Sequence, residues 1–147
     1  MQHRNRWLII VFLIIAALPL TACAQKSAAA SNPKPAVAEP IEGSEFKRVV
    51  VTEKAAQRLD IQTAQVSQEQ VKGTRRLAVP YASVIYGLHG ETWVYTNPES
   101  LAFVRAPITV DYIDGDTAFL LVGPPIGTAV VTVGGAELYG TETGVSK

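Results

Sequence analysis

The stretch from Phe103 to Val122 reads FVRAPITVDYIDGDTAFLLV and carries the clearest structural signal in the chain. β-Branched and aromatic residues are frequent in both halves, and Asp114-Gly115 stands between them. An Asp-Gly pair between two such runs is typical of a tight β-hairpin, because glycine adopts positive φ without steric cost. The sequence therefore predicts two antiparallel strands, Phe103–Tyr112 and Thr117–Val122.

Similar runs lie on both sides of this hairpin. Val79–Tyr86 and Thr92–Tyr95 flank the loop Gly87-Leu88-His89-Gly90, and Thr128–Val133 ends at Gly134-Gly135. Short strands at this spacing, with turn residues between them, predict a mainly β fold: a small antiparallel β-barrel or sandwich.

One short helix is expected before these strands. Val49-Val50-Val51 predicts a strand, Thr52 offers a capping hydroxyl, and Glu53–Leu59 consists of good helix formers. The pattern becomes extended again from Ile61. The predicted domain spans residues 45–147, and eight of its side chains are expected to be mostly buried: Val50, Leu59, Ile61, Val84, Trp93, Val104, Leu120 and Val131.

The N-terminal segment has the features of an export signal. Arg4 and Arg6 precede Trp7–Leu20, a run of 14 residues without a charge. A positive start followed by an apolar stretch is typical of a signal peptide, and the run is shorter than the roughly 18–20 residues that span a bilayer.

Leu20-Thr21-Ala22-Cys23 follows this run directly and resembles the bacterial lipobox. The resemblance implies that residues 1–22 are removed and that the thiol of Cys23 receives a lipid. The protein would then be anchored on the extracytoplasmic side of a membrane in the cell envelope. The alternatives are an ordinary signal peptide followed by an unmodified cysteine, and an uncut segment. Cys23 is the only cysteine, so an intrachain disulfide is excluded.

Residues 23–44 are expected to be a disordered tether, because alanine, serine, lysine and proline predominate there and offer little apolar surface. Without residues 1–22, the 13 basic residues fall to 11 against 13 acidic ones, because Arg4 and Arg6 are lost. A slightly acidic chain lacks the positive field that attracts phosphates, so nucleic acid is not expected as a partner.

Several motifs occur in an order that resembles the periplasmic adaptor subunits, or membrane-fusion proteins, of tripartite efflux systems. They are VTEKAAQRLDIQTA (51–64), VPYASVIY (79–86), TWVY (92–95), FVR (103–105) and GGAEL (134–138). The resemblance implies that the folded part corresponds to the adaptor's membrane-proximal domain, which lies beside the inner-membrane transporter.

The chain also departs from the adaptor pattern. In the family, a helical hairpin, a lipoyl-like domain and most of a β-barrel separate the first of these motifs from the others, whereas here only Gln65–Ala78 lies between them. The resemblance therefore implies a domain formed by the two chain ends alone. Without the helical hairpin, it has no means of reaching an outer-membrane channel.

Residues with the potential for catalysis or metal binding are few. His89 lies alone in a glycine-bounded loop, and a triad of Ser83, His89 and Asp111 lacks the glycine pattern of a nucleophile elbow. Asp111, Asp114 and Asp116 suggest a polar turn, because the distal glutamate of a calcium loop is missing. No catalytic residue, cofactor or metal site is therefore predicted.

The remaining motifs have structural explanations as well. Gly123–Gly127 contains two prolines and no following lysine, unlike a phosphate-binding loop. Met1, the only methionine, would be lost with the signal, which leaves no soft-metal ligand. Trp93, Tyr95 and Phe103 suit a ligand-stacking patch, but aromatic residues in strands more often form cross-strand pairs.

Two functions remain. The resemblance implies a non-catalytic accessory module of an envelope efflux or transport system, whose partner is a transporter or a full-length adaptor. The alternative is a stand-alone envelope lipoprotein whose β-domain binds a ligand or another protein without any pump. The sequence does not identify the partner-binding residues.

Overall fold

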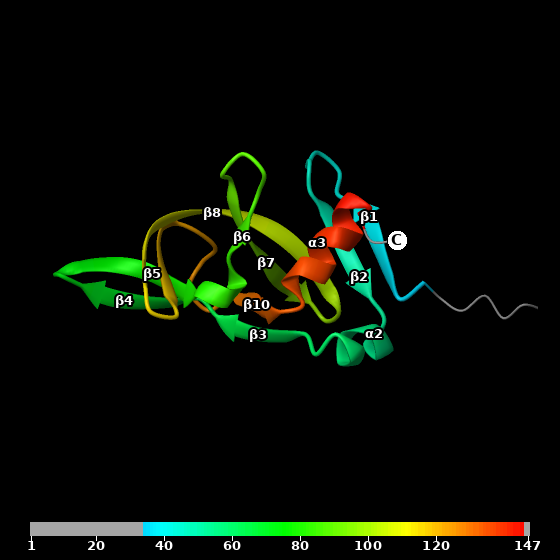
Figure 1. Ribbon diagram of the computed structural model, residues 1–147, viewed down its shortest axis with the longest axis horizontal. Coiled ribbons are helices and arrows are strands. Elements are labelled where there is room, and N and C mark those ends of the chain that lie inside the picture. The colour runs from blue at the N-terminus through cyan, green and yellow to red at the C-terminus, as the bar shows by residue number, and fades with distance from the viewer. Residues whose placement is uncertain (1–33, 146–147) are drawn as a thin grey trace, which may run out of the picture. The chain divides into compact units, whose positions relative to one another are not determined.

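The computed structural model describes residues 34–145, so the predicted signal segment and Cys23 lie outside the described residues. The described part is mainly β, with 54% strand and 16% helix, and forms an antiparallel sheet curled into a half-barrel, with one main helix (Figure 1). The predicted fold class is therefore confirmed.

The strands and helices follow one another along the chain with short connections. Their bounds are β1 (Ala36–Pro40), β2 (Lys47–Val51), α2 (Glu53–Arg58), β3 (Gln62–Gln65), β4 (Ser67–Val71), β5 (Thr74–Pro80), the 3-10 turn η1 (Tyr81–Ser83), β6 (Ile85–Tyr86), β7 (Thr92–Glu99), β8 (Ala102–Asp114), β9 (Thr117–Val122), β10 (Ala129–Val133) and α3 (Gly135–Thr143).

The 13-residue strand β8 connects the two parts of the sheet. Its first part pairs with β7 on one edge and with β2 on the other, and its second part pairs with β9. Asp114 lies opposite Thr117 across the β8–β9 turn, where Gly115 has φ +55°. The hairpin predicted from Asp114-Gly115 is confirmed.

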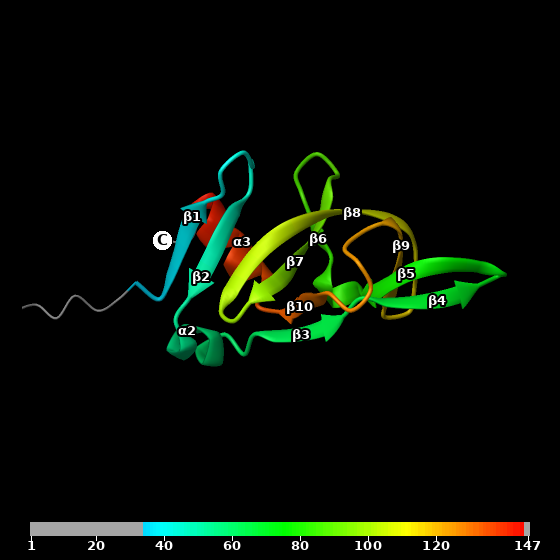
Figure 2. The same ribbon diagram turned by 180° about the vertical axis from the view of Figure 1, so that it is seen from behind.

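The half-barrel follows the strand order β3-β10-β7-β8-β9-β5-β4. Val66, between β3 and β4, exchanges backbone hydrogen bonds with the β9–β10 loop: its N–H donates to Thr128 O at 2.9 Å, and its carbonyl accepts from Gly127 N at 2.8 Å. The β4–β5 hairpin projects from the end of the sheet beyond this point (Figure 2).

Two separate cores lie on opposite faces of β7, β8 and β10. Successive side chains of a strand point to opposite faces, so neighbouring residues such as Val94 and Tyr95 are both buried but in different cores. The half-barrel core contains Val66, Val79, Val94, Ile108, Ala118, Leu120 and Val130. The helix-side core contains Val49, Val51, Ala55, Tyr95, Phe103, Val131 and Leu138.

Of the eight residues predicted to be mostly buried, two are fully buried and six are partly buried. Leu120 and Val131 are buried as predicted, with 1% and 2% of their surface exposed. The other six residues are half-buried: Val50, Leu59, Ile61, Val84, Trp93 and Val104. In β2 the prediction chose the wrong face, because Val49 and Val51 enter the core and Val50 lies between them.

The predicted tether is wrong for its last part. Ala36–Pro40 forms β1, which pairs with β2 in antiparallel register, and Pro35 O accepts a hydrogen bond from Thr52 N at 2.9 Å. Backbone hydrogen bonds to β2 compensate for the low apolar content of this segment, which had suggested disorder. Of the predicted tether, residues 23–33 lie outside the described residues.

Helix α2 confirms the helix predicted at Glu53–Leu59, with the Thr52 hydroxyl accepting from Ala55 N at 3.2 Å. The prediction of a single helix is wrong, because the chain forms α3 after Gly134. The predicted continuous strand Val79–Tyr86 is also wrong, since η1 interrupts it and separates β5 from β6.

A substitution at Gly134 tests how tightly α3 is joined to the sheet. Gly134 precedes α3 with φ +92°, and an added Cβ would lie 2.9 Å from Ile61 Cγ1. We expect Gly134→Ala to lower the free energy of unfolding by more than the about 1–2 kcal/mol of a left-handed residue alone. Gly144→Ala is the control, because φ is +77° there and no atom lies within 4 Å of the added Cβ. Equal losses in urea unfolding would mean that Ile61 moves away without cost.

Candidate functional site

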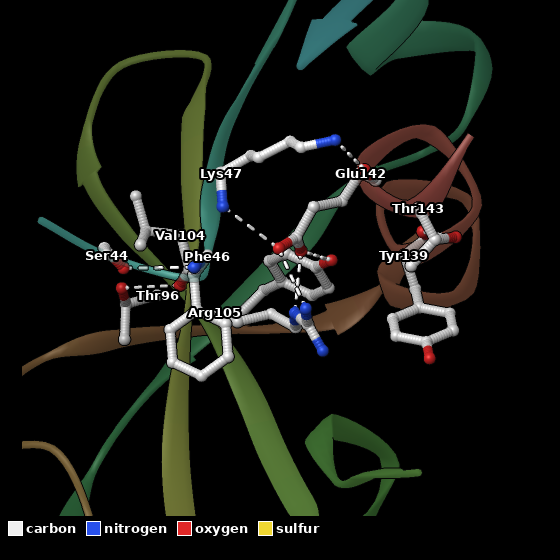
Figure 3. A network of polar contacts seen from close by, with 10 residues as sticks. Ser44, Phe46, Lys47, Thr96, Val104, Arg105, Tyr139, Glu142 and Thr143 are labelled. Atoms are coloured by element: carbon white, nitrogen blue, oxygen red, sulfur yellow. Dashed lines mark hydrogen bonds and ion pairs between the residues drawn. The ribbon is translucent and has the colours of Figure 1, made fainter. Parts of the chain in front are cut away.

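Glu142 is a buried carboxylate in the last turn of α3, with only 3% of its surface exposed. The guanidinium of Arg105 on β8 donates Nε–H to Oε2 at 2.8 Å and Nη2–H to Oε1 at 3.0 Å (Figure 3). This bidentate pairing matches the planar geometries of the guanidinium and the carboxylate, and such pairs are among the stronger charge-assisted interactions in proteins.

Two further residues contact Glu142. The hydroxyl of Tyr95 on β7 donates to Oε2, and the backbone N–H of Lys47 on β2 donates to Oε1 at 3.1 Å. The ammonium of Lys47 also donates to the backbone carbonyl of Glu142 at 3.3 Å. Burial, and then the hydrogen bond to Glu142, raise the pKa of Tyr95 well above its usual range. The phenol therefore stays protonated as a hydrogen-bond donor.

Three aromatic rings surround the guanidinium of Arg105. Its Cζ lies 4.7 Å from the ring centroid of Trp93, 4.8 Å from that of Phe46 and 5.2 Å from that of Tyr139. Trp93 and Tyr139 also stack on each other, with centroids 6.4 Å apart. Cation–π attraction and the ion pair together hold α3 against the sheet.

The geometry of this network indicates a structural role. The carboxylate is already paired with Arg105 and accepts from Tyr95, so it is poorly placed to take a proton from a substrate. Glu142 is not predicted from the sequence, because the last expected strand, Thr128–Val133, ends before it. The one hint in the sequence is Arg105, a charged residue within the otherwise mostly apolar first half of the predicted strand Phe103–Tyr112, which would need a partner if it were buried.

A cleft of about 660 Å³ adjoins Arg105. It lies between the β1–β2 loop and the β6–β7 loop, which project on the same side of the sheet in both views (Figures 1 and 2). Its lining includes Phe46 and Trp93 beside Arg105, and Pro107 and Ile108 on β8.

Two glutamates flank this cleft, one on each side. Glu45 is exposed near the end of the β1–β2 loop, and Glu91 ends the β6–β7 loop. The Glu91 carboxylate accepts from the backbone N–H of His89 at 3.0 Å, and backbone N–H donors lower the pKa of Glu91. Leu88 at the loop tip is 94% exposed. The cleft thus combines an acidic rim with aromatic walls, which suits a cationic or aromatic group.

The three residues of the hypothetical triad have separate environments. The Ser83 hydroxyl is buried and donates to Pro80 O at 2.7 Å, whereas His89 is exposed in its loop. Asp111 accepts from Arg76 Nε at 2.8 Å across the sheet. Ser83 and Asp111 therefore each have a structural partner, and the three residues do not form a catalytic triad.

Two of the three clustered aspartates flank a polar turn in the structure, and the third lies within β8. Asp111 is paired with Arg76, and Asp114 and Asp116 flank the tight β8–β9 turn at Gly115. Among residues 34–145, no three His, Cys, Asp or Glu side chains are grouped closely enough to hold a metal ion.

The three aromatic residues that were weighed as a ligand-stacking patch are divided between the core and the cleft. Tyr95 and Phe103 belong to the helix-side core and are 0% and 3% exposed. Trp93 lies on the same face of the sheet and is half-buried between Tyr139 and the cleft. Only Trp93 of the three is therefore available to contact a ligand in the cleft.

No protein-family model, curated protein or solved structure matches the chain. In the part of the chain that the structure describes, no helix is long and apolar enough to cross a membrane.

Proposed function

We propose that this chain is a non-catalytic lipoprotein module of an envelope efflux or transport system, which docks on a membrane partner such as a transporter or a full-length adaptor. The proposal depends on the motif order that resembles the adaptor family. It implies lipid attachment at Cys23 and a location on the extracytoplasmic side of a membrane.

The pairing of the two adaptor-like regions is the observation that carries this proposal. If the chain is an adaptor reduced to its two ends, the region 51–64 should pack against the region 79–138. β3 pairs in antiparallel register with β10, with Ala64 opposite Val130. β2, which leads into the first region, pairs with β8, with Val49 opposite Phe103. This arrangement supports a self-contained domain made from the regions that meet in a full adaptor.

Lipid attachment provides the first test. We expect a clickable fatty acid to label the protein in cells and Cys23→Ser to abolish the label, because the thiol is the acylated group. Ser27→Ala, a small change a few residues further along, should keep the label. Labelling of the serine variant to the same extent would refute lipid attachment at Cys23.

Docking is tested by affinity purification from gently solubilised, cross-linked membranes. We expect a transporter or a full-length adaptor to be recovered with the wild-type chain, and recovery to fall sharply with Cys23→Ser. A lipid anchor raises the effective concentration of a weakly bound membrane partner, so its loss weakens docking without any change in the contact surface.

A second function is favoured by the cleft beside Arg105. Its acidic rim at Glu45 and Glu91 and its half-buried Trp93 wall suit a ligand-binding, stand-alone lipoprotein. Recovery of no transport component, together with unchanged drug and metal tolerance of a deletion strain, would favour this alternative over docking in a transport system.

A further inference from the structure

A second groove of about 660 Å³ lies between the two helices and the start of β1. Its lining is mainly apolar and includes several residues without a bulky side chain. The apolar lining residues are Pro35, Ala36, Ala55, Leu59, Ala136, Gly140 and Val145. Its charged lining residues are Lys34, Arg58 and Glu137.

The small residues of the groove suit an incoming helix. Ala36, Ala55, Ala136 and Gly140 place backbone close to the open space, and small residues at a helix interface allow close approach of the partner backbone. Two walls of the groove are the helices α2 and α3, which present side chains along the groove and not the edge of a sheet to which a partner strand could pair. A partner helix satisfies its own backbone and needs only an apolar face.

The position of the groove indicates where its occupant lies. Lys34, at the rim, is 11 positions after Cys23. Even a fully extended chain of that length spans only about 36–40 Å. If Cys23 carries the lipid, the groove is therefore held within this distance of the membrane surface.

The charges of the rim indicate the polarity of the occupant. Lys34 and Arg58 are exposed basic residues, against the single acidic residue Glu137. A partner with acidic residues beside its apolar face complements this rim. Val145 is 75% exposed at the same groove and offers an apolar contact that the domain itself does not cover.

We propose that the groove between α2 and α3 binds an amphipathic helix of a membrane protein, next to one of its membrane-spanning segments, with acidic residues facing Lys34 and Arg58. This proposal rests on the proposed docking function and names the docking surface.

Photo-cross-linking of the full chain in intact cells tests the proposal. One cross-linking residue replaces Glu137 in the groove, and another replaces Leu121 on β9, which is 54% exposed and lines no part of the groove. We expect the Glu137 position to label a membrane protein, and mass spectrometry to place the labelled peptide in an amphipathic, acidic helix beside a membrane span.

Matched variants show whether the groove itself is occupied. Ala136→Leu fills the groove and should lower the yield from position 137 by about tenfold, the effect of about 1.4 kcal/mol of lost binding. Thr143→Leu, an exposed change on α3 outside the lining, should not. Arg58→Glu should lower the yield, whereas Lys54→Glu on the exposed surface of α2 should leave it nearly unchanged. Circular dichroism of each variant checks that the fold is retained.

Four outcomes would overturn the inference. Labelling of phospholipid alone from position 137 would assign the groove to lipid, and labelling of a second copy would assign it to self-association. Labelling of a membrane protein only from position 121 would leave the proposed function standing and reject this surface. Labelling of no membrane protein from either position would reject both.

Discussion

Replacing Glu142 by alanine is expected to lower the free energy of unfolding by about 3–5 kcal/mol. The variant leaves the guanidinium of Arg105, which is only 11% exposed, without its countercharge. It also removes the acceptor of the buried Tyr95 hydroxyl. Urea unfolding with an unchanged slope measures the loss directly.

Arg76 and Asp111 provide a matched control for this prediction. Their Nε–Oδ2 distance of 2.8 Å equals the Nε–Oε2 distance between Arg105 and Glu142, but their side chains are 29% and 32% exposed. Asp111→Ala should therefore cost only about 0.2–1 kcal/mol. Equal losses from the two alanine variants would show that burial does not set the strength of the Arg105–Glu142 pair.

The double variant Arg105→Met with Glu142→Leu separates two explanations for the loss. If the single variant is unstable because an unpaired charge remains buried, removal of both charges should recover most of the stability. Tyr95→Phe in the same background removes the hydroxyl that has lost its acceptor. No recovery in the double variant would mean that the aromatic contacts around Arg105 contribute most of the stability.

Leu120→Ala is expected to cost about 2–5 kcal/mol, because it leaves a cavity in the half-barrel core, where Leu120 is 1% exposed. The neighbouring residue on β9 is the control. Leu121 is 54% exposed, so Leu121→Ala should change stability by no more than about 0.5 kcal/mol. A large loss at Leu121 would indicate that its face of β9 is covered by another part of the protein.

Local signals in the sequence predict some elements well. The Asp114-Gly115 turn and the Thr52 cap depend on residues within a few positions of each other, so both are visible in the sequence. The two core faces are less visible, because both faces of β7 are covered and the alternation of polar and apolar residues disappears at Val94-Tyr95.

Elements stabilised by distant contacts are those that the sequence does not predict. Helix α3 contains Gly135 and Gly140, which disfavour a helix, and it depends on burial of Leu138 and on the bond between Glu142 and Arg105, 37 positions away. Strand β1 has low apolar content and depends on the ladder with β2. The groove and the cleft likewise depend on elements far apart in the chain.

The hydrogen bond between Lys47 and Glu142 joins residues that are 95 positions apart. This separation has a consequence for when the domain can fold during synthesis. The ribosome makes β1 and β2 long before α3. The apolar residues of the helix-side core therefore stay exposed to solvent until α3 has been made. Such long-range closure slows folding and keeps the growing chain open. If the proposed signal segment directs export, a chain that closes late can still pass unfolded through a protein-conducting channel and complete its folding on the far side of the membrane.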